Sequence, residues 1–121
     1  MTVLVWIAVA LIGGAGSVLR FLVDGAVSAR FGGRFPLGTF VVNCTGAVLL
    51  GLVGGLAFNG DAALLAGTAA VGSYTTFSTW MLETHRVGEE RRVAAAVSNV
   101  LLSLVFGVGA AALGQWIGVR L

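Results

Sequence analysis

Four long apolar stretches alternate with short polar segments along the chain. Residues 1–19, 35–60, 62–82 and 93–119 contain no charged side chain. A helix needs roughly 20 residues to cross the hydrocarbon of a bilayer, and lipid leaves backbone polar groups without partners unless a helix satisfies them. The pattern therefore predicts four transmembrane helices, at about residues 3–22, 37–58, 62–83 and 93–117.

The polar segments carry residues that end helices. Gly32 and Pro36 mark the first connection, and proline suits the first turn of the next helix. Asn59–Asp61 predicts a tight turn, and residues 83–92 are expected to form a polar loop. The first stretch has no preceding basic residue and exceeds the roughly 7–15 apolar residues of a signal peptide, so we expect it to be retained. Residues 1–121 are thus expected to form a single transmembrane domain.

Composition excludes several classes of protein. Hydrophobic residues make up 58% of the chain and charged residues 10%, against about 45–50% and 25% in soluble domains. So few charges cannot cover the surface of a soluble enzyme, and they do not suit a disordered chain or a nucleic-acid binder. The single cysteine, Cys44, excludes an internal disulfide and a cysteine-based metal site.

Glycine spacing predicts how the helices meet. The chain contains 19 glycines. Gly51 and Gly55, and likewise Gly114 and Gly118, are four residues apart, the spacing that lets two membrane helices approach closely. Because four short helices bury little surface by themselves, we expect an oligomer.

Polar side chains inside the apolar stretches are candidate functional residues. Thr39 and Asn43 share one helix face, as do Asn99 and Ser103. Such groups cost free energy in lipid unless they are paired or hydrated. They either join helices by hydrogen bonds or line a narrow aqueous path, in which amide and hydroxyl donors would suit a small anion. Arg20, at the expected end of the first helix, either reaches the interface or attracts an anion.

The segment Gly72–Trp80 carries the strongest signal, because it places five Ser and Thr hydroxyls and a tyrosine at bilayer depth. A helix break centred on Gly72 is expected there, and broken membrane helices free carbonyl groups that coordinate cations. Phe77 and Trp80, three residues apart, are predicted to project to one side. The positive edges of aromatic rings stabilise an anion; the alternative is that both rings face lipid.

Three motifs resemble the Fluc (CrcB) family of fluoride channels, and the likeness extends over all four expected helices. The resemblance implies an all-α membrane protein with a broken third helix, assembled as an antiparallel, dual-topology dimer with two fluoride pores along the subunit interface. The motifs are Gly13-Gly14-xx-Ser17-xx-Arg20, Gly38-Thr39-xx-Val42-Asn43-xx-Gly46 and Gly72-xx-Thr75-Thr76-Phe77-Ser78-Thr79.

The resemblance also implies roles for individual residues. Asn43 would line the pore, Phe77 and Trp80 would supply two aromatic rings, and the backbone carbonyls of Gly72 and Thr75 would hold a structural sodium ion at the dimer axis. Trp80 departs from the phenylalanine usual in the family, and Ser73 departs from a glycine. The remaining residues expected along the fluoride pathway are Thr39, Ser103, Asn99, Arg20, Thr76 and Ser78.

Arginines are distributed unequally between the two sides of the predicted bundle. The positive-inside rule then predicts both termini outside the cytoplasm. Such a bias suggests pairing with an unlike homologous subunit of opposite orientation, although a dimer of identical chains remains an equal alternative. One side holds Arg30, Arg34, Arg86, Arg91 and Arg92, with Arg20 at its edge, and the other holds Arg120.

The sequence therefore predicts a passive channel, not an enzyme, that exports fluoride across the plasma membrane. A small four-helix proton-coupled drug exporter is the alternative, but it needs a carboxylate within the first helix, and residues 1–19 have none. A structural or holin-like pore-forming membrane peptide would not need the polar segment Gly72–Thr79.

Overall fold

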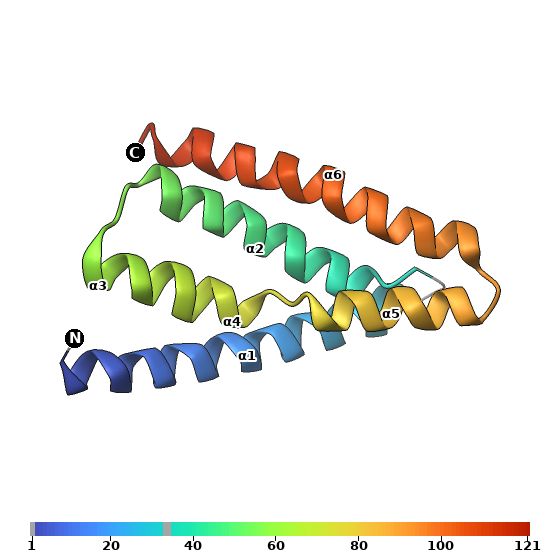
Figure 1. The fold of residues 1–121 in the computed structure, drawn as a ribbon, viewed down its shortest axis with the longest axis horizontal. Helices are drawn as coiled ribbons and strands as arrows, with labels where there is room; N and C mark the ends of the chain where they lie inside the picture. The colour runs from blue at the N-terminus through green and yellow to red at the C-terminus, as the bar shows by residue number, and fades with distance from the viewer. Residues whose placement is uncertain (1, 33–34) are drawn as a thin grey trace.

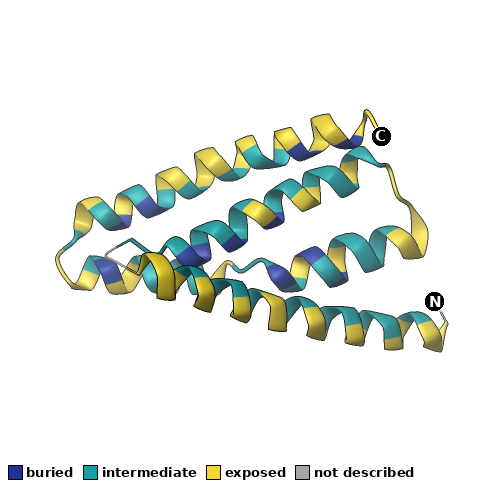
Figure 2. Cartoon of the chain, turned by 180° about the vertical axis from the view of Figure 1, so that it is seen from behind, coloured by how far each residue is buried: buried dark blue, intermediate teal, exposed yellow. Residues whose placement is uncertain are grey.

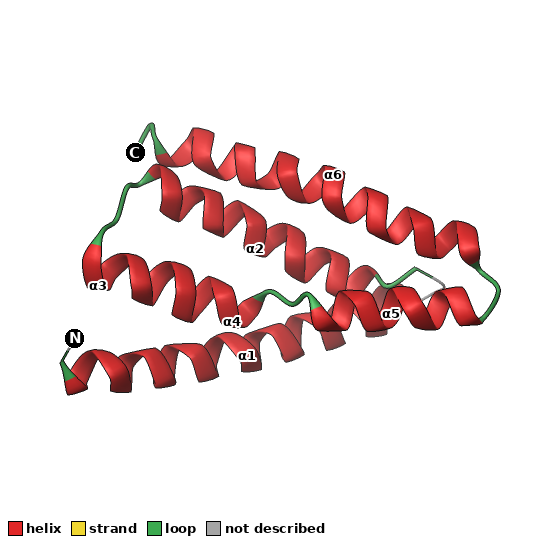
Figure 3. Ribbon diagram, viewed as in Figure 1, coloured by secondary structure: helices red, strands yellow, loops and turns green. Residues whose placement is uncertain are grey.

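The computed structural model describes residues 2–32 and 35–121, and every regular element within these ranges is helical (Figure 3). The predicted all-helical class is confirmed. The Arg34 counted in the charge bias lies outside the described residues. The elements are α1 (Val3–Phe31), α2 (Leu37–Gly55), α3 (Gly60–Ala63), the π-helix η1 (Leu64–Val71), α4 (Gly72–Tyr74), α5 (Ser78–Glu89) and α6 (Val93–Gly118).

The chain runs back and forth along the long axis of the molecule. Helix α1 leads away from the N-terminus and α2 returns, α3 to α5 together make the third pass, and α6 brings the C-terminus back to the end of the molecule where the N-terminus lies (Figure 1). Helices α1, α2 and α6 are each long and apolar enough to cross a membrane. The third pass is divided among shorter elements.

Helix α1 is longer than the sequence predicts, because it continues past residue 22 to Phe31. Charged side chains mark the edge of the hydrocarbon, but they do not end a helix. Asp24 instead accepts a hydrogen bond from Ser28 one turn later, at 3.2 Å. The extension places Arg20 well inside α1, which corrects the expectation that it lies near the helix end. Helix α2 is shorter than expected and ends at Gly55.

The prediction of a polar loop at residues 83–92 is also wrong in extent, because the observed connection is shorter. Helix α5 continues to Glu89, so that only residues 90–92 connect it to α6. The backbone N–H of Arg91 bonds to the Gly88 carbonyl at 3.1 Å, and that of Arg92 bonds to the Val87 carbonyl at 3.2 Å. This pair of bonds is a Schellman motif, which ends a helix with one left-handed residue. Arg91 is that residue, with φ of 59°.

Close packing of α2 on α6 follows from their glycines, as predicted. A Cβ on Gly51 would overlap the Ala111 carbonyl oxygen, and one on Gly118 would lie 2.9 Å from the Cα of Gly55. Side chains at these positions would hold the helices apart. Most large apolar side chains point outward, and the buried positions are confined to the inner faces (Figure 2).

Candidate functional site

The third pass loses its helical path between α4 and α5. Gly72 itself is helical, with φ of −61° and ψ of −36°, so the departure is not centred on it. Thr75 is extended, with ψ of 162°, and residues 75–77 lie outside both helices. The Thr75 hydroxyl donates back to the Val71 carbonyl at 3.1 Å, and Ser and Thr back-bonds of this kind compete with helical bonds.

Asn43 on α2 binds the backbone exposed by this departure. Its Nδ2 donates to the Thr76 carbonyl at 2.8 Å, and its Oδ1 accepts from the Thr76 N–H at 2.9 Å. The side chain thus replaces two backbone partners that a continuous helix would supply. Without them, buried peptide groups would cost free energy.

Asn43, Thr76, Phe77 and Trp80 meet in one cleft of ≈ 270 Å³. The Phe77 and Trp80 rings are 5.7 Å apart between centroids, with their planes at 83°, so one ring presents its edge to the other's face. Phe77 is 70% exposed on the single chain. The cleft is lined by Asn43, Gly46, Ala47, Leu50, Thr75, Thr76, Phe77 and Trp80, none of them charged.

A hydrogen-bonded network joins Trp80 to α6. The indole Nε1 donates to the backbone carbonyl of Asn99 at 3.4 Å. The Asn99 side chain, which is 1% exposed, donates from Nδ2 to the Thr84 hydroxyl at 2.7 Å and accepts from Ser103 at 3.5 Å. Asn99 and Ser103 are therefore linked, as their spacing suggests. Sequence reasoning missed Thr84, although it lies one helical turn after Trp80.

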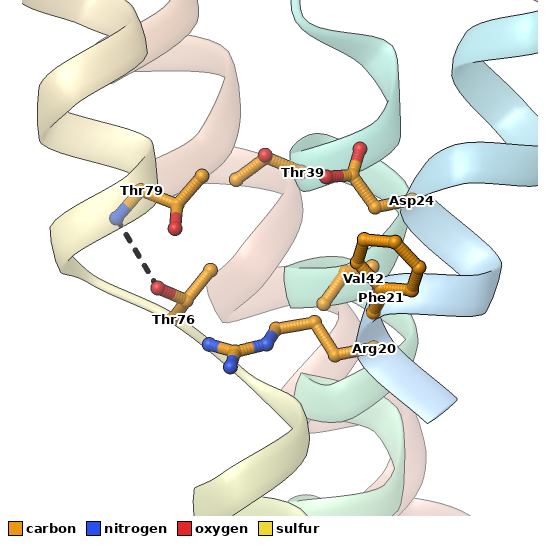
Figure 4. Close-up of a pocket in the computed structure, with 7 residues that line it drawn as sticks. All are labelled: Arg20, Phe21, Asp24, Thr39, Val42, Thr76 and Thr79. Atoms are coloured by element: carbon orange, nitrogen blue, oxygen red, sulfur yellow. Dashed lines mark hydrogen bonds between the residues drawn. The ribbon is translucent and has the colours of Figure 1, made fainter. Parts of the chain in front are cut away.

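A second pocket, of ≈ 190 Å³, lies between α1, α2 and the third pass. In Figure 4, the Arg20 side chain extends from α1 toward Thr76, and Asp24 and Thr39 lie near one another on another side. Thr76 lines both this pocket and the cleft. The predicted site residues of the pocket and those of the cleft are therefore adjacent. The lining consists of Arg20, Phe21, Asp24, Thr39, Val42, Thr76 and Thr79.

Thr39 has a partner that the sequence did not indicate. It is 2% exposed, and its hydroxyl donates to a carboxylate oxygen of Glu83 on α5. The assignment of residue 83 to a polar loop concealed this pair. The signal was present in the spacing, since Glu83 lies four residues after Thr79 and continues its helix face.

Two side-chain hydroxyls and two backbone carbonyls complete the surroundings of the interrupted segment. The Thr79 N–H bonds to the Thr76 hydroxyl at 3.2 Å, and the exposed Ser78 hydroxyl lies 3.4 Å from the same atom. The Thr76 and Thr79 N–H groups are the usual helical donors to the carbonyls of Gly72 and Thr75. Since both bond to side chains instead, those carbonyls lack these helical partners. Among the described residues, no three His, Cys, Asp or Glu side chains form a metal site.

The fold and the site define a multi-pass, all-helical membrane protein whose uncharged polar groups and aromatic rings meet beside an interrupted third pass. Residues 7–115 match the family described as "CrcB-like protein, Camphor Resistance (CrcB)". The chain belongs to this family, which confirms the inference from its motifs. Together with its three apolar spans, this membership identifies an integral protein of the plasma membrane.

Relatives match the chain over nearly its full length. "Fluoride-specific ion channel FluC 2" of Mycolicibacterium paratuberculosis is 66% identical over 94% of this chain and 93% of its own length. The protein of the same name in Mycobacterium tuberculosis is 62% identical, over 97% and 93%. "Fluoride-specific ion channel FluC 1" of Leifsonia xyli is 41% identical, over 98% and 89%. These names lend no support to the drug-exporter alternative.

Proposed function

We propose that this protein is a passive fluoride channel that lets fluoride leave the cytoplasm. The observation that carries the proposal is the uncharged cleft in which Asn43 faces the Phe77–Trp80 ring pair. The names of its relatives agree with this function. A conducting site must bind its ion strongly enough for entry and weakly enough for exit, and neutral dipoles satisfy that requirement better than a fixed cation.

Asn43 offers a donor that its backbone bonds do not use. An amide nitrogen carries two protons, and one of them is committed to the Thr76 carbonyl. The second is the proposed donor to fluoride in the cleft. The positive edges of the Phe77 and Trp80 rings supply further stabilisation, so that the anion sheds water stepwise onto groups already fixed in place.

The adjacent pocket is the proposed entrance to this path. Arg20 supplies the attractive charge, and the Thr76 and Ser78 hydroxyls are the proposed donors nearby. Thr39 lines the same entrance with its proton committed to Glu83. Ser103 and Asn99 continue the polar path along α6. The Ser103 hydroxyl is held only at 3.5 Å by Asn99, a long bond that an anion readily replaces.

The carbonyls of Gly72 and Thr75 fit the proposed sodium site. Hard cations prefer oxygen ligands, and carbonyls of an interrupted membrane helix supply such ligands. Both carbonyls lack their helical donors because Asn43 and Thr76 capture them. When bound, the ion would neutralise these dipoles at bilayer depth and stabilise the third pass as one broken transmembrane segment.

Two subunits of opposite orientation complete the proposed channel. The exposed Phe77 ring and the shallow cleft on the single chain leave a path that a second subunit would enclose. The partner is either a second copy or an unlike homologous subunit. The arginines favour a fixed orientation, since Arg30 lies in the last turn of α1 and Arg86 in the last turn of α5, with Arg91 just beyond it. These helix ends lie away from the termini (Figure 1).

Efflux from proteoliposomes containing the purified chain tests this function. We expect fluoride efflux without chloride efflux, and a strong reduction in Phe77→Ile. Phe58→Ile is the matched control, because Phe58 is an exposed ring beyond the end of α2. Absence of fluoride efflux, both alone and with an unlike CrcB-family subunit, would refute the proposal. Efflux from the single chain would show that a second copy suffices.

A further inference from the structure

Trp80 and Thr84 hold one residue of α6 between them. They are four residues apart and so lie on the same face of α5. The indole of Trp80 contacts the backbone carbonyl of Asn99, and the hydroxyl of Thr84 contacts its side chain. Asn99 is thus fixed to α5 at two points, one of which belongs to a ring of the cleft.

The directions of these hydrogen bonds follow from their chemistry. The Thr84 hydroxyl lies 2.8 Å from the Trp80 carbonyl, which only accepts, so the hydroxyl proton is committed there. Thr84 must then accept from Asn99, which orients the amide with Nδ2 toward Thr84 and Oδ1 toward Ser103. No other arrangement satisfies all of these groups, and Asn99 is buried, where an unsatisfied amide is costly.

The two contacts differ in strength. The Asn99–Thr84 bond, at 2.7 Å, is short and partly buried, whereas the indole bond is long, at 3.4 Å. The short bond therefore fixes the distance between α5 and α6 at this turn, and the long bond depends on that distance. A phenylalanine at this position would have no N–H, so the placement of its ring would not depend on a hydrogen bond to α6.

We propose that Thr84 is a positioning residue for fluoride conduction. By holding Asn99, it keeps the Asn99 carbonyl within reach of the Trp80 N–H, and this tether fixes the indole ring edge-to-face with Phe77. Thr84 lies outside the cleft lining, so its effect on the cleft is transmitted through the Trp80 ring. The proposal rests on the fluoride-channel function proposed above.

Thr84→Val tests the tether, since valine keeps the shape and removes the hydroxyl. We expect fluoride efflux about tenfold lower, as for loss of one buried hydrogen bond, and near-normal efflux in Thr84→Ser, which restores the hydroxyl. Ser98→Ala is the matched control, because it removes an α6 hydroxyl beside Asn99 that takes no part in the network. Equal efflux in Thr84→Val and the parent protein would overturn the proposal.

A double-mutant cycle with Trp80→Phe separates positioning from general stability. Without an indole N–H there is nothing to tether, so Thr84→Val should leave the efflux of Trp80→Phe unchanged. An equal loss in both backgrounds would overturn the proposal and show that Thr84 acts independently of the ring, through the packing of α5 on α6 or through the Asn99 side chain.

Fluorescence supplies a readout that does not depend on transport. In a Trp6→Phe, Trp116→Phe background, Trp80 is the one remaining tryptophan, and Thr84→Val should lower its anisotropy as the ring gains freedom. Unchanged anisotropy would overturn the tether. If the parent protein carried no fluoride, the proposed function would fail, but the anisotropy would still decide whether Thr84 holds the ring.

Discussion

Asn43 and Thr76 exchange two hydrogen bonds across the interface between α2 and the third pass, at 2.8 and 2.9 Å. A side-chain amide has the donor and acceptor geometry of a peptide group, and here it pairs with the backbone as a neighbouring strand would. The pairing lets the third pass depart from its helical path without leaving the Thr76 peptide group unsatisfied. It also fixes the proposed fluoride donor beside the cleft.

Asn43→Asp should disrupt both roles. A carboxylate keeps the acceptor for the Thr76 N–H but sets a negative oxygen against the Thr76 carbonyl. We expect a loss of about 1–3 kcal/mol in the free energy of unfolding, typical for an unsatisfied buried group, and fluoride efflux at least about tenfold lower. Thermal unfolding in detergent and efflux from proteoliposomes measure the two effects.

The control for this change is Asn59→Asp. Asn59 is exposed and precedes α3 without making a side-chain cap bond, so its substitution should leave stability and efflux close to those of the parent. If Asn43→Asp behaved like this control, the Asn43–Thr76 pairing would contribute neither to stability nor to conduction.

The positions of the passes were predictable because charge exclusion from lipid is strong. The gaps between charges located α2 and α6 to within a few residues, since Pro36 and the polar residues before Val93 bound them closely. The end of α1 was not predictable in this way. Charged residues such as Asp24 and Arg30 can be helical outside the hydrocarbon, and no residue before Phe31 ends the helix.

The residue types of the site were predictable, but their pairing was not. Asn43, Thr76 and Trp80 stand out in sequence as polar or aromatic groups in an apolar setting. Their partners depend on how the helices face one another, which local spacing does not encode. The Asn43–Thr76 pair spans two passes, and the same holds for Thr39 and Glu83, whose contact was hidden by the assignment of Glu83 to a loop.

Gly114→Ala should weaken the α2–α6 contact. A Cβ at this position would overlap the Val48 carbonyl oxygen and lie 2.8 Å from the Leu52 nitrogen, so the helices must separate. We expect a loss of roughly 1–3 kcal/mol in the free energy of unfolding, as for other overpacked sites. Gly107→Ala on the same helix is the control, because its Cβ would meet nothing within 4 Å. Equal melting temperatures for the two variants would contradict this packing argument.

Arg91→Gly should stabilise the protein. Arg91 has φ of 59°, a left-handed conformation that costs an L-residue roughly 1–2 kcal/mol and that glycine adopts freely. A rise in the melting temperature with unchanged fluoride efflux is expected. Arg92→Gly provides the comparison, because φ of −99° at Arg92 gives glycine no advantage there. A rise in both variants, or in neither, would count against strain at Arg91.

Removing sodium should destabilise the protein if the Gly72 and Thr75 carbonyls hold the ion. A ligand that binds only the folded state raises stability with its concentration, by about 2.7 kcal/mol at one hundred times its dissociation constant. The melting temperature should therefore fall when sodium is exchanged for a large organic cation at constant ionic strength. Adding sodium back should restore the melting temperature. Adding the same concentration of the organic cation should restore it less. Identical unfolding curves at all sodium concentrations would exclude a stabilising sodium site, and would leave the hydrogen bonds of Asn43 as the main support of the interrupted pass.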